Sequence, residues 1–246
     1  MIYKRFRLNA DWEHWEVQIN DRRVYNESTE IIFLIDKSGS MARLTKDTIE
    51  GFNGFVESQK DDTKTILTTV LFDTSWKNLH DGIDIYEVEP MTNKDYLAGG
   101  GTALLDAIGD TINRVQDRHD ELGENKPDNV LFVITTDGEE NSSHKFTKPQ
   151  IEKMIKHQTN GHGWKFMFLG AKMDAVKEAE GLGISTNYTA NYDWSGMGTD
   201  ALYRSVSTIT TASKNVDVSL NNLNLQSVYD NCVTNTKITS TTTSSK

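Results

Sequence analysis

The feature that most constrains the fold is a short apolar run that ends in an aspartate and two serines. Residues 31–35 are Ile-Ile-Phe-Leu-Ile, and Asp36, Ser38 and Ser40 follow them around a glycine. Five consecutive apolar residues rich in isoleucine predict a strand that is buried on both faces, as in a parallel sheet covered by helices. In such sheets, ligand sites lie in the loops at the carboxyl ends of the strands. We therefore expect an α/β domain with a site at residues 36–40.

The pentapeptide 36–40 allows two interpretations when it is taken alone. Asp-x-Ser-Gly-Ser supplies one carboxylate and two hydroxyls on a tight turn, a set of oxygens that suits a hard cation such as Mg²⁺. The same side chains also suit an Asx-turn or a helix N-cap, in which they only accept hydrogen bonds from the amides at a helix start. The pentapeptide alone does not distinguish a metal-binding site from a helix cap.

Length and composition limit the classes of protein that need to be considered. The chain has 246 residues, of which 36% are hydrophobic, enough for one large α/β domain with extensions or for two small ones. A formal net charge of −10 argues against general binding to nucleic acids or anionic membranes. The single cysteine, Cys232, excludes an intramolecular disulfide and a thiolate zinc cluster.

Two further absences in the sequence bear on location. No stretch approaches the roughly 18 consecutive apolar residues of a membrane span. The basic residues near the N-terminus are not followed by an apolar region, so no signal peptide is expected. We expect a protein that is cytoplasmic where it is made.

Strand and helix patterns alternate along most of the chain. The predicted strands cover residues 31–35, 65–72, 83–88, 129–136, 164–169 and 187–189. The predicted helices cover residues 44–59, 102–122, 148–157, 173–181 and 200–214. Alternation of this kind predicts a doubly wound, Rossmann-like α/β fold, with a mostly parallel sheet and helices on both faces. The short connection between 65–72 and 83–88 predicts an antiparallel pair, and hence one antiparallel edge strand.

The two ends of the chain differ from this pattern. Residues 1–27 form an N-terminal extension, in which alternation over 12–19 and a turn toward 23–25 predict a short hairpin or an edge strand packed on the main domain. The α/β domain covers residues 28–215. Residues 216–246 form a tail rich in Ser, Thr and Asn, which buries too little apolar surface to offset its ordering entropy. We expect this tail to be extended or disordered when the protein is alone.

Two more polar groups stand where a helix begins or a buried strand ends. Three glycines at residues 99–101 allow close approach of the backbone and precede Thr102, at the predicted start of a helix. Thr102 alone is at least as well explained as an N-cap as by a ligand role. The second fully buried strand, 129–136, is followed at once by Asp137, which repeats the arrangement at Asp36.

These three motifs together resemble the metal-ion-dependent adhesion site (MIDAS) of von Willebrand factor A (VWA) domains. The surrounding residues match as well: Phe-Leu-Ile-Asp at 33–36, Gly-Gly-Thr-Ala-Leu-Leu-Asp-Ala-Ile at 100–108 and Ile-Thr-Thr-Asp-Gly-Glu at 134–139. The resemblance covers about residues 28–215 and is greatest to intracellular bacterial and phage members of the family. It implies the VWA fold, with Mg²⁺, or Mn²⁺ in its place, at the top of the sheet.

The resemblance also implies a role for each residue of the three motifs. Ser38, Ser40 and Thr102 would supply oxygens directly or through water, and Asp36 and Asp137 would supply negative charge. An open coordination position would accept an Asp or Glu carboxylate from a partner protein. The loop residues expected to face that partner are Gly100, Gly101, Gly138 and Glu139.

Three functions are weighed on this basis. The leading hypothesis is a metal-dependent protein-binding module without chemistry of its own, whose partner in bacterial relatives is often an AAA+ ATPase. The alternative is a structural or docking component of a large assembly such as a phage virion, which would use the domain and the C-terminal tail for attachment. The third is metal-assisted phosphoryl transfer. The sequence contains no nucleophile elbow, Walker loop or pair of histidines at metal-ligand spacing, so we expect no catalytic residues.

Overall fold

The computed structural model describes residues 2–7, 13–18, 28–61, 63–214 and 224–243, and its central element is a six-stranded sheet. The strands are β3 (Thr29–Asp36), β4 (Thr65–Phe72), β5 (Trp76–Asp84), β6 (Asn129–Thr136), β7 (Lys165–Gly170) and β8 (Thr189–Asn191). Their order is β5-β4-β3-β6-β7-β8, and every pair is parallel except β4 with β5 at the edge. The predicted class, a mostly parallel α/β sheet with one antiparallel edge strand, is confirmed.

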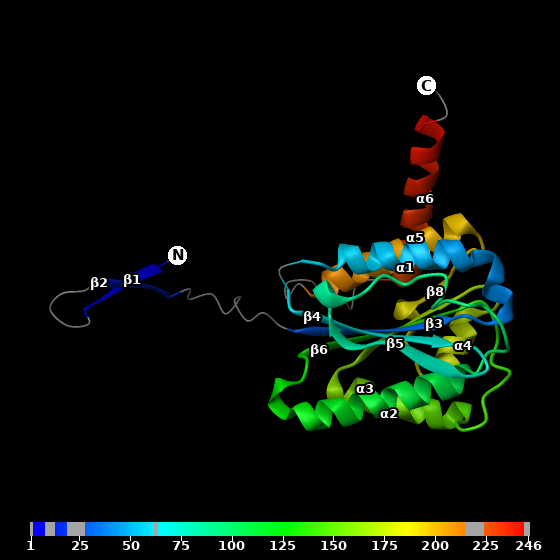
Figure 1. Ribbon diagram of the computed structural model, residues 1–246, viewed down its shortest axis with the longest axis horizontal. Helices are drawn as coiled ribbons and strands as arrows, with labels where there is room; N and C mark the ends of the chain where they lie inside the picture. Colours follow the sequence, from blue (N-terminus) through cyan, green and yellow to red (C-terminus); the bar gives the residue numbers. More distant parts are fainter. Residues whose placement is uncertain (1, 8–12, 19–27, 62, 215–223, 244–246) are drawn as a thin grey trace.

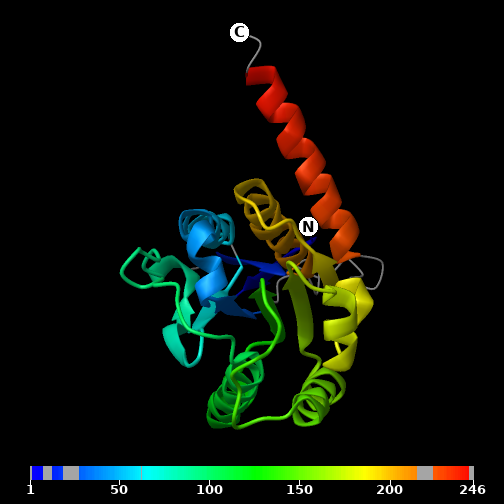
Figure 2. The same cartoon turned by 90° about the vertical axis from the view of Figure 1, so that its right-hand side faces the viewer.

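Helices cover both faces of this sheet (Figures 1 and 2). On one face lie α1 (Thr45–Ser58), α5 (Gly196–Ser213) and the first turns of α6 (Leu225–Thr243). On the other face lie α2 (Leu104–Leu122), α3 (Lys148–His162) and α4 (Ala175–Gly181). The short 3₁₀ helices are η1 (Gly39–Leu44), η2 (Ile85–Glu87), η3 (Gly123–Asn125) and η4 (Thr186–Tyr188).

Strand β3 supplies side chains to both hydrophobic cores, which explains its continuous apolar run. Ile31, Phe33 and Ile35 point into the core under α1 and α5. Ile32 and Leu34 point into the core under α2 and α3. All five side chains are fully buried, because successive residues of a strand face opposite sides of the sheet.

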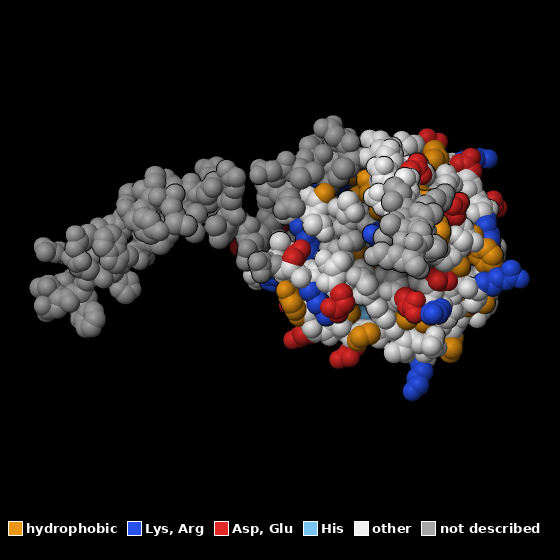
Figure 3. Space-filling view, turned by 90° about the horizontal axis from the view of Figure 1, so that it is seen from above, with side chains coloured by type: hydrophobic (Ala, Val, Ile, Leu, Met, Phe, Trp, Pro, Cys, Tyr) orange, Lys and Arg blue, Asp and Glu red, His pale blue; other side chains and the backbone are white. Residues whose placement is uncertain are grey.

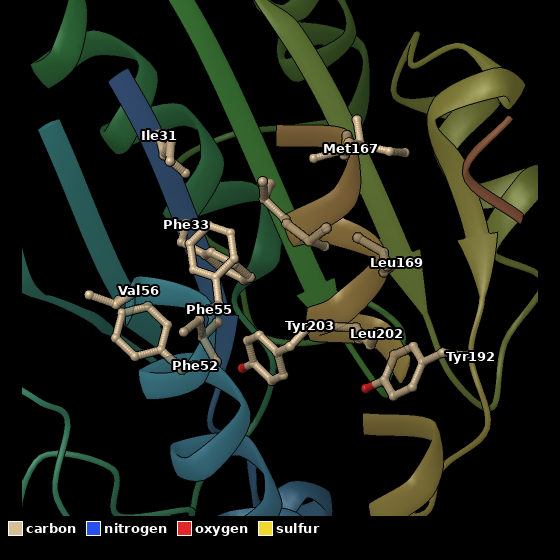
Figure 4. Packing of buried hydrophobic residues seen from close by; sticks show 14 of the residues in the cluster. Ile31, Phe33, Phe52, Phe55, Val56, Met167, Leu169, Tyr192, Leu202 and Tyr203 are labelled. Atoms are coloured by element: carbon tan, nitrogen blue, oxygen red, sulfur yellow. The ribbon is translucent and has the colours of Figure 1, made fainter. Parts of the chain in front are cut away.

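Phe33 is the centre of an aromatic cluster between the sheet and its first helices (Figure 4). Its ring lies edge-on to Phe52 and Phe55 of α1, with centroids 5.9 and 5.3 Å away. It stacks on Tyr203 of α5 at 5.7 Å. A side chain at Gly51 would clash with the Tyr203 ring, so glycine at this position lets α1 and α5 approach each other. The cluster fixes α1, and with it the loop that joins β3 to α1.

The order of strands creates a crevice at one edge of the sheet. From β3 the chain passes through α1 to β4 on one side, and it later returns through α2 to β6 on the other side of β3. Ile35 and Thr135 pair in the register of these two parallel strands, so their carboxyl ends lie side by side. Ligand sites in open α/β sheets lie at such a reversal of strand order.

The edge strand lies earlier in the chain than the sequence pattern predicts. Strand β5 begins at Trp76, because the Asp73 side chain accepts a hydrogen bond from the Ser75 amide (2.8 Å) and turns the chain at once. The predicted strand 83–88 is therefore wrong over most of its length. Ile83 and Ile85 stand two residues apart and imitated strand alternation, but β5 ends at Asp84 and Ile85 begins the 3₁₀ helix η2.

A strand is present where the N-terminal alternation predicts one, but the expected hairpin stays a prediction. Alternation over 12–19 corresponds to β2 (Glu13–Gln18), which pairs antiparallel with β1 (Ile2–Arg7) in a two-stranded sheet of its own. The partner expected at 23–25 lies outside the described residues. The division into an extension, a domain and a tail stays a prediction.

The expectation of an extended or disordered tail is wrong for residues 225–243, which form helix α6. Leu225 is fully buried and Tyr229 nearly so, and both belong to the core under α5. The Gln226 side chain accepts a hydrogen bond from the Asn191 amide (2.7 Å), which ties α6 to the end of β8. The Ser, Thr and Asn content of the whole segment concealed a short apolar stripe at helical spacing.

Replacing Leu225 by alanine should therefore lower the free energy of unfolding by about 2–3 kcal/mol, since it removes a buried side chain and leaves a cavity. Chemical denaturation would measure the change. Thr234→Ala, an exposed position of the same helix, serves as the control and should have little effect. Equal effects of the two substitutions would contradict the packing of α6 on the core.

The surface carries charges of both signs. On the face shown in Figure 3, Asp and Glu side chains are interspersed with Lys and Arg. Phosphate backbones are bound by clustered basic side chains, and the described side chains on this face show none gathered in that way. No helix in the described part of the chain combines the length and the apolar character that a membrane crossing needs.

Candidate metal centre

Two buried carboxylates meet at the carboxyl edge of the sheet. Asp36 is the last residue of β3, and Asp137 directly follows β6, the parallel neighbour of β3. Asp36 is fully buried and Asp137 is 2% exposed. The structure thus brings together two of the predicted site residues that lie a hundred positions apart.

Asp36 is held in place by hydrogen bonds to both of its carboxylate oxygens. The amide of Ser38 donates to Oδ1 (2.7 Å), and the hydroxyl of Thr136 donates to Oδ2 (2.6 Å). The hydroxyl of Tyr96 donates to its main-chain carbonyl (2.5 Å). Burial, assisted by the nearby charge of Asp137, raises the pKa of Asp36 above its ordinary value, although the bonds from Thr136 and Ser38 oppose this shift.

The Ser40 hydroxyl points to the other carboxylate, and the Ser38 hydroxyl lies beside it. The hydroxyls of Ser38 and Ser40 lie 3.1 Å apart, and Ser40 donates to Asp137 Oδ1 (2.6 Å). Ser38 occupies the N-cap position of η1, yet its side chain makes no capping hydrogen bond. The Asx-turn of the capping interpretation is present at Asp36, but the serine side chains face the site and do not cap the helix.

Thr102 is also not a helix cap. Helix α2 begins at Leu104 and has Ala103 at its N-cap position. Thr102 is 3% exposed, and its main chain is fixed by two hydrogen bonds with Asn141: its amide donates to Oδ1 (2.9 Å), and its carbonyl accepts from the Asn141 amide (3.0 Å). A Cβ atom at Gly138 would lie 3.6 Å from the Thr102 hydroxyl, so this hydroxyl lies beside the loop that follows Asp137.

The glycine loop completes the edge of the site. The Gly100 carbonyl accepts from the Gly39 amide (3.1 Å), which joins the glycine loop to the loop after β3. Gly100 has φ +71°, and a Cβ there would lie 2.6 Å from the Thr74 hydroxyl, so only glycine fits without strain. Of the residues expected to face a partner, Gly100 and Glu139 are exposed, and Gly101 and Gly138 are half-buried.

Two surface hollows flank this edge. A hollow of about 440 Å³ lies between the loop after β6 and α4, lined among others by Glu139, Lys148 and Lys177. A smaller one of about 190 Å³ lies on the other side, lined among others by Lys37 and Leu97. A bound segment that reached the carboxylates would have concave surface on either side of them.

Two residues at this edge were missed by the sequence analysis. The Lys172 ammonium lies 3.0 Å from Asp137 Oδ2 and 3.2 Å from the centroid of the Trp194 ring system. Lys172 follows β7, and Trp194 follows β8, so both stand beyond the carboxyl ends of parallel strands. Their place a few residues beyond two predicted strands is a partial signal, but no motif around either residue singles it out.

The residues present fit a small divalent cation. Asp36, Ser38, Ser40, Thr102 and Asp137 offer only oxygen atoms, the ligands that Mg²⁺ and Mn²⁺ prefer. Within the described ranges, no three or more His, Cys, Asp or Glu side chains are grouped so that they could hold a metal. A metal centre here depends on the hydroxyl groups as well as the two carboxylates.

No family profile and no curated protein sequence matches the chain. Solved structures do. The vWF domain of the type V pili tip protein Mfa5 from Porphyromonas gingivalis is similar with a TM-score of 0.56 and 9% identity, over 78% of this chain and 98% of that one. The manganese-loaded TRAP protein of Plasmodium vivax is similar with a TM-score of 0.50 and 20% identity, over 69% of this chain and 70% of that one.

A third similar structure is proximal thread matrix protein 1 from the mussel byssus, with a zinc-occupied MIDAS motif. It gives a TM-score of 0.53 and 16% identity, over 74% of this chain and 48% of that one. The chain therefore spans about half the length of the mussel protein. At these identities the similarity establishes the fold, which is that of a VWA domain.

Proposed function

We propose that this chain, which has the VWA fold, is a metal-dependent protein-binding module. Mg²⁺, or Mn²⁺ in its place, would be held by Asp36, Ser38, Ser40, Thr102 and Asp137. The observation that carries the proposal is the orientation of the serine hydroxyls: that of Ser40 donates to Asp137, and that of Ser38 lies beside it and does not cap η1. A turn that served only to start a helix would use those hydroxyls on the helix amides.

The two carboxylates have different parts in this proposal. Asp137 accepts hydrogen bonds from two partly exposed side chains, those of Ser40 and Lys172, and lines the open side with the serine hydroxyls. Asp36 accepts from the Ser38 main-chain amide and from the buried Thr136 hydroxyl. Asp36 therefore supplies charge and acts through water. Few protein ligands and retained waters are the usual way in which proteins hold Mg²⁺. A bound metal would supply a positive charge with an exchangeable position, and the ligand that fits it is an Asp or Glu carboxylate of a partner protein.

The similar structures support the metal and the adhesive role. The mussel protein is described with zinc in its MIDAS motif and the Plasmodium protein as manganese-loaded. The Porphyromonas protein is a pilus tip component. We propose no chemistry of its own for the present chain. The AAA+ ATPase partner and the cytoplasmic location remain proposals that rest on the sequence resemblance.

Removing the charge of Asp36 should abolish most of the metal binding without unfolding the protein. Asp36→Asn keeps one oxygen that accepts from the Ser38 amide, and its NH2 group can donate to the Thr136 hydroxyl oxygen in place of the present bond. It also removes a buried negative charge. We expect the affinity for Mn²⁺ to fall at least about tenfold, the loss seen when only an outer partner of a metal ligand is removed. Titration calorimetry would measure it, with exposed Asp200→Asn on α5 as the control.

The effect of the same substitution on the free energy of unfolding has a predictable direction. The pKa of Asp36 is higher in the folded state than its ordinary value of 3.8. The folded protein therefore loses stability as the pH rises from the ordinary pKa to the raised one, because the buried carboxyl must then lose its proton. Asp36→Asn should therefore not destabilise the metal-free protein at neutral pH. Unchanged Mn²⁺ binding by this variant would show that the metal centre is wrongly assigned.

The function itself is tested by capture of partners with and without metal. The full chain is immobilised and exposed to a lysate in Mg²⁺ or in chelator, with Asp36→Asn in Mg²⁺ as the matched control. The proposal expects a defined protein that is retained only by the parent chain in Mg²⁺. Retention that is the same in all three conditions would overturn it.

A docking role in a large assembly is the second candidate. The observation that favours it is α6, whose first turns pack on the domain while the rest of the helix extends beyond it (Figure 2). Such a helix offers an attachment element separate from the metal centre. Detection of the protein in purified particles, such as a virion, at a fixed ratio to a shell or tail protein would support this role, and its absence from them would exclude it.

A further inference from the structure

The metal centre contains a cation that belongs to the chain itself. The Lys172 ammonium lies 3.0 Å from Asp137 Oδ2, the carboxylate oxygen that Ser40 does not use. The Asp137 side chain is fully buried, whereas that of Lys172 is 40% exposed. The ammonium therefore reaches from the surface to the carboxylate that lines the open side of the site.

The backbone and a neighbouring ring both hold Lys172 in this position. It has φ 55°, and it is the one non-glycine residue with positive φ among the described residues. This left-handed conformation is unfavourable for a lysine and persists only where the surroundings enforce it. Its ammonium also lies 3.2 Å from the centroid of the Trp194 ring system, within the range of cation–π attraction.

The ring is itself fixed by the rest of the fold. Trp194 lies in the loop between β8 and α5. The preceding residue, Asp193, donates its amide to the Tyr229 hydroxyl of α6 (2.9 Å). Lys172 thus has two partners at the sheet edge, the carboxylate of Asp137 and an aromatic ring that stays in place if the carboxylate is taken by another cation.

Resting on the proposed function, we propose that Lys172 is a tethered counter-ion that competes with the metal for Asp137 and sets the metal affinity. A cation in contact with the oxygens of Ser38, Ser40 and Asp137 comes close to the ammonium, and like charges repel at that range. Metal binding displaces the ammonium from Asp137. The repulsion lowers the affinity for metal, and the ion pair stabilises the metal-free state.

The test compares Mn²⁺ titrations of the full chain, the Lys172→Met variant and the Lys177→Met variant. Methionine is also unbranched at Cβ, so the left-handed backbone is as unfavourable as before. Lys177 is an exposed lysine of α4 near the same edge, so its replacement removes the same charge without a contact to Asp137. We expect Lys172→Met to bind Mn²⁺ at least about tenfold more tightly, and Lys177→Met to bind like the parent.

Two further readouts are independent of the comparison of affinities, and the first needs no metal. In chelator, Lys172→Met should melt at a lower temperature than the parent, because Asp137 loses its counter-ion. Displacement of Lys172 should also change tryptophan fluorescence during the titration of the parent chain. That change should disappear in Trp194→Phe, which leaves the other four of the five tryptophans in place.

The outcomes separate this proposal from the proposed function. If the parent binds Mn²⁺ and Lys172→Met binds it equally or less tightly, the counter-ion role is wrong and the metal centre stands. A gain of the same size in Lys177→Met would show a general effect of charge and would also overturn the role of Lys172. If neither the parent nor Lys172→Met binds Mn²⁺, the metal centre is wrong and the counter-ion role fails with it.

Discussion

Replacing Glu30 by glutamine is expected to lower the free energy of unfolding by about 3–5 kcal/mol, the range for removing one partner of a buried ion pair. Glu30 lies in β3, is fully buried and forms an ion pair with Arg118 of α2. Its other carboxylate oxygen lies 2.7 Å from His119 Nε2, and the Thr68 hydroxyl donates to the first (2.8 Å). An amide group turned toward Arg118 would place donors against donors, and the charge of Arg118 would lose a buried partner.

Denaturation of Glu30→Gln by urea would measure this effect. The matched control is Glu57→Gln on α1, where an exposed carboxylate pairs with Lys60. Surface pairs of this kind contribute about 0–1 kcal/mol, so the control should hardly differ from the parent. Glu30 is at the start of β3 and the metal centre is at its end, so Mn²⁺ affinity should be the same in both variants. A loss no larger than in the control would show that the Glu30 pair does not stabilise the fold.

Loss of the partner's metal-binding carboxylate should weaken complex formation by about 2–5 kcal/mol, the range for truncating one side of a buried, hydrogen-bonded charge pair. Without that carboxylate, only water fills the position on the metal. Thr102→Ala should weaken the complex more than it weakens the fold, because the main-chain bonds between Thr102 and Asn141 do not involve the side chain that is removed.

Binding measured at saturating Mg²⁺, for Thr102→Ala and for a scan of the partner's acidic residues, would check this prediction. The competing explanation is docking through the groove between α1 and α5, which has a volume of about 510 Å³ and is lined in part by Asp47, Tyr203 and Thr208. Thr208→Ala is therefore the informative control. If it weakens the complex while every acidic substitution in the partner is tolerated, the partner does not bind through the metal.

The site could be predicted where a strand signal and a polar signal coincide. Asp36 and Asp137 each follow a long apolar run, so their strands were evident, and parallel pairing placed both at one edge. Lys172 and Trp194 follow strands of six and three residues, and their neighbours form no motif. The approach of Lys172 to Asp137, and of Trp194 to Lys172, arises from the way β7 and β8 are added to the sheet, which no local pattern records.

The burial of the Glu30 carboxylate could not be predicted from the sequence for a related reason. A glutamate next to an apolar run is typical of an exposed strand end, because carboxylates are rarely buried without a partner. Its partners Arg118 and His119 stand 88 and 89 positions away, on the far end of α2. Only the packing of α2 across β3 shows that the charge is compensated.

Helix α6 also connects the far end of the molecule mechanically to the metal edge. Gln226 and Tyr229 of this helix accept hydrogen bonds from the amides of Asn191 and Asp193, which lie three residues and one residue before Trp194. A pull on the end of α6 is therefore transmitted through these bonds to the loop that holds the ring beside Lys172. Force would reach the rim of the site if a complex bound α6 under tension. The same would happen if the chain were tethered to a surface by its C-terminus in a binding assay.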